Sequence, residues 1–147
     1  MKRLLRTFVL LATLASLPAF AQQAREFGEY AVHYNALSSS LITPEIARAY
    51  GIRRSDSRGL INISVMKNNG DNAPSAVQAG VTVTGRNLTG QTRNVDMRVI
   101  NEGEGAIYYI GELTVRNMET FDFTVTVTPE GQSATFEFEF RQQFYTE

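Results

Sequence analysis

The chain has 147 residues, with 14 basic and 15 acidic side chains, one histidine and no cysteine or tryptophan. Without cysteine the protein has neither a disulfide framework nor a thiol nucleophile, so its stability must come from packing. A formal net charge of −1 gives no sign of a strongly basic, nucleic-acid-binding surface.

The first 21 residues have the three parts of a cleavable secretory signal peptide. A basic head precedes an apolar stretch at residues 8–17, and the small residues of Ala19-Phe20-Ala21 fit a signal peptidase. The apolar stretch is about half of the roughly 20 residues that a membrane-spanning helix needs. A lipid anchor of the bacterial type would require a cysteine. We therefore expect cleavage between Ala21 and Gln22, no stable membrane anchor, and release into a Gram-negative periplasm.

Cleavage would leave residues 22–147, which we expect to form one domain. A chain of this length can bury roughly two thirds of the surface exposed by its unfolded form. The signal carries three basic and no acidic residues, so the mature chain keeps 11 basic and 15 acidic side chains, a net charge of −4. This charge disfavours nucleic acid and anionic lipid as partners.

The first half of the mature chain predicts two strands separated by a short helix. Residues 29–36 alternate between apolar and polar side chains, which is typical of a half-buried strand. The run Thr43-Pro44-Glu45 has the residues of a helix N-terminus, and Gly51 is suited to end that helix. Residues 53–59 are polar and predict an exposed loop, and residues 60–66 alternate again as a second strand.

The second half predicts further strands divided by turns rich in glycine, asparagine and proline. Residues 68–74 break the alternation, and residues 77–84 predict a third strand. Residues 91–100 and 106–115 flank a glycine-rich turn and predict a hairpin. In the last predicted pair, Pro129-Glu130-Gly131 turns the chain between residues 121–128 and 136–140.

These elements predict an all-β fold of about seven strands with one short helix. Clean apolar–polar alternation is typical of antiparallel sheets with one solvated face, and two such sheets bury their apolar faces against each other. We therefore expect an immunoglobulin-like antiparallel β-sandwich, with a small barrel as the alternative because strand order cannot be read from the pattern. The absence of tryptophan and of a cysteine pair excludes the antibody variety.

Candidate catalytic groups are few. His33 is the only histidine, it falls on the polar face of the first predicted strand, and the chain has no Gly-x-Ser-x-Gly motif. The asparagine-rich turn at residues 68–72 lacks the ligand spacing of a calcium loop. Carboxylate pairs could serve glycoside hydrolysis, although in hairpins they more often aid solubility; they are Glu102 with Glu104 and Glu137 with Glu139. We expect no catalytic residue, cofactor or metal.

Tyrosine and arginine are the better candidates for a binding surface. Tyrosine side chains are amphipathic and enriched at interfaces. Tyr108 and Tyr109 are adjacent on a predicted strand, so their side chains leave on opposite faces and one of them can be exposed. The candidate partner-binding residues are His33, Tyr34, Arg53, Arg54, Tyr108 and Tyr109.

Five segments of the mature chain resemble one family of small exported proteobacterial proteins, domain of unknown function forty-four twenty-six. They are residues 27–36, 49–55, 87–91, 106–110 and 136–145. The resemblance covers nearly the whole mature chain and implies a periplasmic β-sandwich. It implies no activity or cofactor.

The sequence thus favours a non-enzymatic periplasmic module that binds a protein or an envelope component. Binding would use an exposed strand edge or a tyrosine–arginine patch. One alternative is an envelope-polymer hydrolase or an enzyme inhibitor, which the compartment and the carboxylates suggest. The other is a structural domain that forms a homodimer. The exposure of the tyrosines and the surroundings of His33 bear on this choice.

Overall fold

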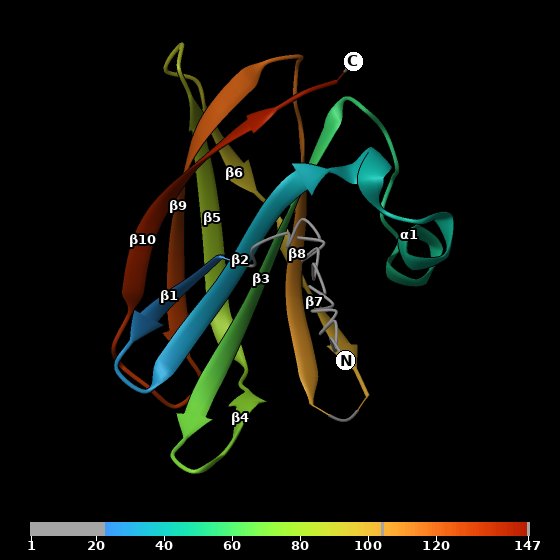
Figure 1. Cartoon of the computed structure of the whole chain (residues 1–147). Helices are drawn as coiled ribbons and strands as arrows, with labels where there is room; N and C mark the ends of the chain where they lie inside the picture. Colours follow the sequence, from blue (N-terminus) through green and yellow to red (C-terminus); the bar gives the residue numbers. More distant parts are fainter. Residues whose placement is uncertain (1–22, 104, 147) are drawn as a thin grey trace, which may run out of the picture.

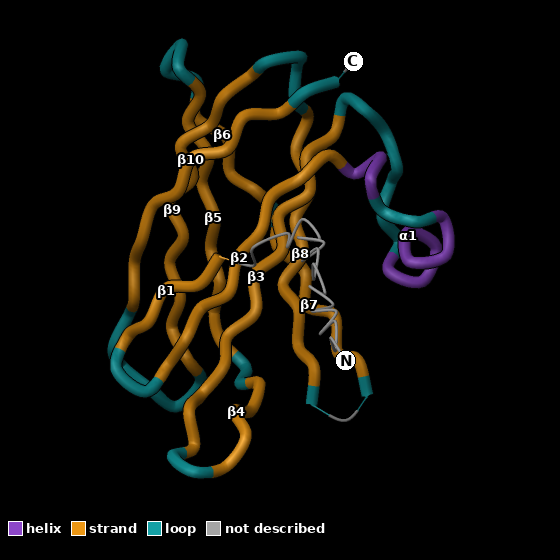
Figure 2. Tube along the Cα trace, viewed as in Figure 1, coloured by secondary structure: helices purple, strands orange, loops and turns teal. Residues whose placement is uncertain are grey.

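A computed structural model describes residues 23–103 and 105–146, which fold into two antiparallel β-sheets packed face to face (Figures 1 and 2). The predicted β-sandwich is confirmed, because the two sheets do not close into a barrel. The predicted signal peptide and Glu104 lie outside the described residues. No helix within the described residues has the length and apolar character needed to cross a membrane.

The larger sheet has six strands in the order β1-β2-β3-β8-β7, with β4 paired to the far end of β3. Their bounds are β1 (Gln23–Phe27), β2 (Tyr30–Ser38), β3 (Arg58–Asn69), β4 (Asn72–Ala76), β7 (Met97–Glu102) and β8 (Ala106–Thr114). The smaller sheet has four strands in the order β10-β9-β5-β6. Their bounds are β5 (Ala79–Asn87), β6 (Thr92–Val95), β9 (Glu119–Pro129) and β10 (Phe136–Phe144).

The core lies between the sheets and is built by side chains that recur at every second position. The predicted inward faces of β2, β3 and β9 are confirmed, since all of their apolar members are buried: Tyr30, Val32, Tyr34, Ile61, Ile63, Val65, Phe121, Phe123, Val125 and Val127. Aromatic contacts join the sheets, such as Tyr34 to Phe140 with ring centroids 4.7 Å apart. Each fully buried aliphatic or phenylalanine side chain contributes roughly 1.5–3 kcal/mol to folding.

The single strand predicted over residues 91–100 is wrong, because the chain passes from one sheet to the other at Asp96. β6 pairs with β5 in the smaller sheet, whereas β7 pairs with β8 in the larger. Val95 is buried in the core before the crossing, and Met97 packs against the core after it. The same face therefore stays apolar across the break, which explains why alternation alone did not reveal it.

The described residues contain ten strands, three more than predicted, because β1 and β4 were also missed. Neither alternates strongly, and both are stabilised mainly by pairing with a longer neighbour. β1 pairs with β2 along its whole length, and β4 pairs with the last part of β3. Pro74 lies within β4, a position tolerated because an edge strand need not donate every backbone N–H.

The predicted helix is confirmed as α1 (Pro44–Tyr50), which follows a single 3-10 turn, η1 (Ser39–Leu41). The Thr43 Oγ1 accepts a hydrogen bond from the Ile46 N–H at 3.4 Å. Gly51 ends the helix with φ at 62°, a left-handed conformation that glycine adopts readily. Both short helices lie beside the larger sheet (Figure 1), where Ala47 and Ile52 pack against Leu60 and Ile110.

Candidate functional site

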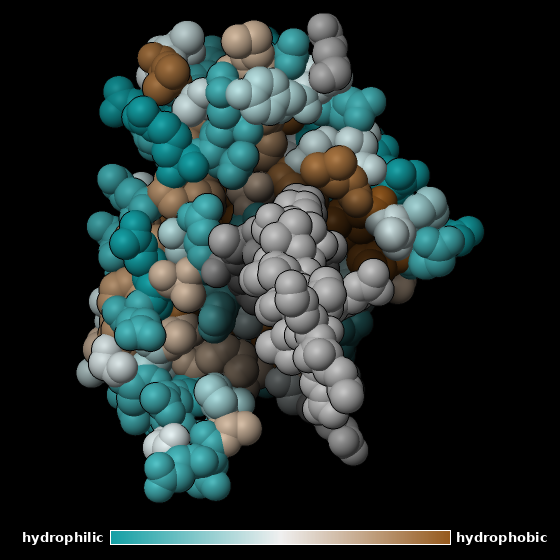
Figure 3. Space-filling model, viewed as in Figure 1, coloured by the Kyte–Doolittle hydropathy of each residue, from teal (hydrophilic) through white to brown (hydrophobic). Residues whose placement is uncertain are grey.

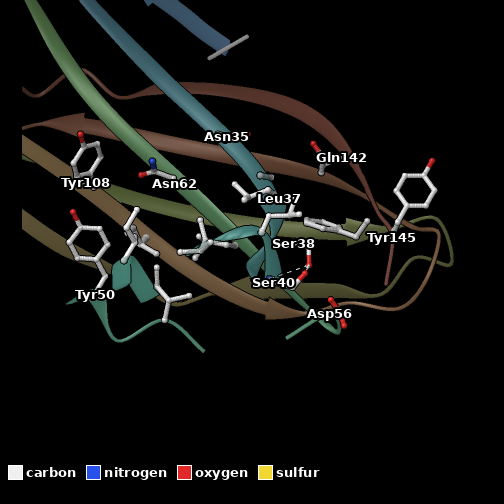
Figure 4. Close-up of a pocket in the computed structure, with 18 of the residues that line it drawn as sticks. Asn35, Leu37, Ser38, Ser40, Tyr50, Asp56, Asn62, Tyr108, Gln142 and Tyr145 are labelled. Carbon is white, nitrogen blue, oxygen red and sulfur yellow. Dashed lines mark hydrogen bonds between the residues drawn. The ribbon is translucent and has the colours of Figure 1, made fainter. Parts of the chain in front are cut away.

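A hollow of about 1330 Å³ lies between the outer face of the larger sheet, the α1 segment and the end of β10 (Figure 4). Three neighbouring strands supply its floor: Asn35 and Leu37 from β2, Leu60 and Asn62 from β3, and Tyr108 and Ile110 from β8. Side chains alternate between the faces of a strand, so these positions point away from the core. Asn35 is the register partner of Asn62, which in turn pairs with Ile110.

The walls of the hollow are largely apolar. One wall carries Ile42, Ile46, Tyr50 and Ile52 from the α1 segment, and the other carries Gln142, Gln143, Phe144, Tyr145 and Thr146 from the C-terminal end. Tyr50 and Tyr145 lie at opposite ends of the hollow in Figure 4. Figure 3 shows hydrophobic side chains gathered beside α1. An apolar ligand surface would therefore be buried on entering.

Hydrogen bonds join the two chain segments that flank α1 in this wall. The Ser39 side chain is fully buried, and its hydroxyl donates to the Arg53 carbonyl at 2.7 Å and accepts from the Ser55 N–H at 3.0 Å. The Arg54 guanidinium donates to the carbonyls of Ile42 and Ser40 at 2.6 and 3.1 Å. The segments before and after α1 are thus tied together, so the wall is held in place before a ligand arrives.

The floor has an unsatisfied polar group. The Asn62 Oδ1 is shielded from solvent, and no hydrogen-bond donor reaches it within the part of the chain that the structure describes. Leaving such an acceptor unpaired costs about 1–3 kcal/mol. Tyr108, whose hydroxyl is another polar group on this face, lies beside Asn62 in Figure 4. Rotation of the Asn62 side chain toward the hollow would let a ligand N–H recover the missing hydrogen bond.

Among the residues that the structure describes, the charged side chains that line the hollow are acidic. They are Asp56, on the segment after α1, and Glu102, at the end of β7. Both are exposed. The hollow therefore suits a neutral or positively charged ligand better than an anionic one.

The structure divides the six sequence-predicted site residues into three groups. Tyr108 on β8 lines the hollow, and His33 on β2 lies on the same outer face of the larger sheet. His33 is half-buried, and its Nδ1 has no hydrogen-bond partner among the described residues. Arg53 and Arg54 are exposed on the segment after α1. Arg53 donates its backbone N–H to the Glu112 Oε1 at 3.1 Å, and Arg54 binds the carbonyls described above.

Tyr34 and Tyr109 form the third group and lie in the core between the sheets. Only 5% and 7% of their surfaces are exposed. The Tyr109 hydroxyl accepts a hydrogen bond from the Ala79 N–H at 2.7 Å, which links the two sheets. Their positions on the inward faces of β2 and β8 remove them from the candidate site, a correction to the sequence-based set.

Asn35, Asn62 and Tyr50 line the hollow but were not predicted from the sequence. The sequence nevertheless held a signal for the hollow. Leu60 and Ile110 are apolar, although they lie on the outer face of the sheet, where a half-buried strand usually carries polar side chains. Both are buried by the α1 segment. Apolar residues on the outer face of a sheet indicate that something covers part of it.

The strongest charge pair lies on the outer face of the smaller sheet. Arg141 donates from Nε to the Asp122 Oδ1 at 2.6 Å and from Nη2 to the Asp122 Oδ2 at 2.9 Å. This hydrogen bonding lowers the pKa of the Asp122 carboxyl and raises the pKa of Arg141. Among the described residues, no three histidine, aspartate or glutamate side chains group closely enough to hold a metal ion.

Comparison with known proteins supports one family. The model of Domain of unknown function (DUF4426) matches residues 24–147. A solved structure of a DUF4426 family protein from Pseudomonas aeruginosa PAO1 is 33% identical, with a TM-score of 0.72 over 85% of this chain and 95% of that one. No curated protein matches. The family resemblance noted in the sequence is thus confirmed: this chain belongs to the DUF4426 family.

Proposed function

We propose that this protein is a non-enzymatic periplasmic module that binds an extended peptide segment, apolar with a basic residue, in the hollow of the larger sheet. The observation that carries the proposal is the unpaired Asn62 Oδ1 on the floor of a large, mostly apolar hollow. Buried acceptors in folded proteins nearly always have a partner, so an orphaned one calls for a donor from outside the described chain.

The lining fits a peptide better than a small metabolite or an acyl chain. Small-molecule sites usually enclose roughly 300–1,000 Å³, and this hollow is larger, at about 1330 Å³. Its carboxamides include Asn35, Asn62, Gln142 and Gln143. A carboxamide offers both a donor and an acceptor, as a peptide group does, whereas an acyl chain would leave both unpaired. Asp56 and Glu102 would attract the basic residue.

The proposed compartment rests on the signal-like residues 1–21. We also propose that the sandwich is immunoglobulin-like. In constant-type immunoglobulin domains one sheet has the strand order A-B-E-D and the other contains C, F and G. We assign A to β2, B to β3, C to β5, D to β7, E to β8, F to β9 and G to β10. The first sheet is then β2-β3-β8-β7 and the second is β5-β9-β10. Both orders agree with the pairing seen here, to which β1, β4 and β6 are added.

A fluorescence anisotropy titration tests the binding proposal. The probes are two fluorescein-labelled decapeptides of alternating leucine and alanine, one carrying two lysines and the other two glutamates. The protein used is residues 22–147, which contains the whole described sandwich. We expect the lysine peptide to bind more tightly than the glutamate peptide. In the double variant Asp56→Asn/Glu102→Gln this preference should disappear.

Asn62→Leu is the decisive variant, because leucine keeps the side-chain volume but removes the carbonyl. We expect it to weaken binding of the lysine peptide about tenfold, which corresponds to roughly 1.4 kcal/mol. Asn94→Leu is the matched control, since Asn94 is exposed on β6 of the other sheet. Equal binding by Asn62→Leu and the unsubstituted protein would refute the proposal. Cleavage of either peptide would favour an enzyme instead.

A further inference from the structure

Three large hydrophobic side chains are exposed at one end of the sandwich. Leu88 is 68% exposed, Met118 63% and Tyr145 60%. Figure 1 shows the connections β5–β6 and β8–β9 at the same end as the C-terminus. Hydrogen bonds join these segments, since the Gln143 Nε2 donates to the Met118 carbonyl at 3.0 Å and the Thr146 N–H donates to the Asn117 Oδ1 at 3.1 Å. We call Leu88, Met118 and Tyr145 the end patch.

Leu88 is held outward by a rigid polar loop. The side chain of Asn87 is buried, and its Oδ1 accepts from the Gln91 N–H and the Thr89 hydroxyl, each at 2.8 Å. The Asn87 Nδ2 donates to the Glu119 Oε1 at 2.9 Å, which fastens this loop to the start of β9. The loop is therefore built to keep its shape while its apolar tip stays in solvent.

Met118 has an unfavourable backbone conformation for its side chain. Its φ is 58°, the only positive φ at a non-glycine residue in the described chain. Glycine or asparagine adopts this conformation more readily than methionine. Two hydrogen bonds fix the turn. The Glu119 N–H donates to the Arg116 carbonyl at 3.1 Å, and the Arg116 N–H donates to the Glu119 Oε2 at 2.9 Å. A strained, exposed apolar residue points to a role in contact with a partner.

Two exposed arginines and one carboxylate, that of Glu119, lie beside the end patch. Arg86 and Arg116 are exposed, and neither forms an ion pair within the described residues. The Arg86 Nη2 lies beside the Leu88 loop, 3.6 Å from the position a Cβ would take on Gly90. The Glu119 carboxylate accepts from neutral donors, the Asn87 amide and the Arg116 backbone N–H, so it keeps its negative charge and the two arginines outnumber it by one. Arginine binds phosphate through two parallel hydrogen bonds.

We propose that the end patch docks on an anionic lipid bilayer. Leu88 and Met118 enter the boundary between headgroups and acyl chains, Tyr145 lies at headgroup level, and Arg86 and Arg116 bind lipid phosphates. The net charge of the mature chain disfavours anionic lipid at long range. At physiological salt, however, charges beyond about 8 Å are largely screened, so the local balance of two arginines against the Glu119 carboxylate favours anionic lipid at contact.

Vesicle co-sedimentation tests this proposal, with residues 22–147 and two lipid compositions. One is phosphatidylcholine with one third phosphatidylglycerol, and the other is phosphatidylcholine alone. We expect binding to the anionic vesicles only, and at least a fivefold loss with Leu88→Ser. Val99→Ser is the matched control, because Val99 is an exposed hydrophobic on β7, outside the end patch. It should bind as the unsubstituted protein does.

Met118→Gly separates docking from a structural role. Glycine relieves the strained φ, so the urea midpoint should hold or rise while binding to anionic vesicles falls at least fivefold. Failure of the unsubstituted protein to bind anionic vesicles overturns the proposal, as does full binding by Leu88→Ser and Met118→Gly. The hollow is a separate test, because Asn62→Leu should retain vesicle binding whether or not the peptide proposal holds.

Discussion

Gly111 shows how one residue permits the crossing between the sheets. It lies on β8 opposite Met97, the first residue of β7. A Cβ at this position would lie 2.5 Å from both the Met97 Sδ and the Val95 Cγ1, and 3.2 Å from the Asp96 carbonyl oxygen. These three neighbours are the residues at which the chain changes sheets. The absence of a side chain at Gly111 is therefore a condition for the crossing.

We predict that Gly111→Ala lowers the free energy of unfolding by about 1–3 kcal/mol, the usual cost of overpacking a core. Gly80→Ala is the matched control on β5, because the nearest atom to its added Cβ is the Thr128 carbonyl oxygen at 3.9 Å. That variant should be neutral or gain up to about 1 kcal/mol. Urea denaturation with unchanged m-values measures both. Equal shifts in the two variants would contradict the packing argument.

At the scale of elements, the Ser39 hydroxyl holds the α1 segment in place through its hydrogen bonds to Arg53 and Ser55. We predict that Ser39→Ala destabilises the protein by about 1–3 kcal/mol, since it leaves the Arg53 carbonyl and the Ser55 N–H, both in part-buried hydrogen bonds, without their partner. The effect should be concentrated near α1. Amide exchange at Ile52, whose N–H bonds to the Ala47 carbonyl at 2.8 Å, should accelerate more than exchange in β9.

Ser40→Ala is the matched control for this element, because the Ser40 hydroxyl bonds to the Ser38 hydroxyl and Arg54 uses only the Ser40 carbonyl. Its exchange pattern should match that of the unsubstituted protein. Uniform acceleration across the chain in Ser39→Ala would mean that α1 unfolds together with the sandwich rather than as a separate wall. The same variant should also weaken binding of the lysine peptide.

Elements with a strong local signal could be predicted, and those fixed by pairing could not. The alternation in β9 and the capping residues of α1 were sufficient, because strand period and capping act over a few neighbouring residues. β1 is fixed by pairing with β2, the next strand in the chain, and the break at Asp96 arises because β6 pairs with β5 in one sheet and β7 with β8 in the other. Alternation within a single segment does not report such pairings. The site shows the same division: Tyr108 could be chosen as an amphipathic residue, whereas Asn62 becomes a candidate only once the register places it on the covered face.

At the scale of the whole molecule, the two proposed surfaces use different parts of the sandwich. The hollow lies on the outer face of the larger sheet, and the end patch lies where the connections β5–β6 and β8–β9 meet the C-terminus. Tyr145 lines the hollow and also belongs to the end patch. Docking at the bilayer would therefore bring one end of the hollow close to the membrane surface.

Both surfaces presuppose export and removal of the signal. β1 begins at Gln23, one residue after the expected new N-terminus, so cleavage between Ala21 and Gln22 would leave every described strand intact.

We predict that the full chain, expressed in a Gram-negative bacterium, accumulates in the periplasm with the intact mass of residues 22–147. Ala19→Leu and Ala21→Leu should keep the mass of the full chain, because signal peptidase requires small residues at both positions. Phe20→Leu, a bulky residue at the tolerant middle position, should be processed normally. Retention of the full mass by the unsubstituted protein would remove the basis for a periplasmic role.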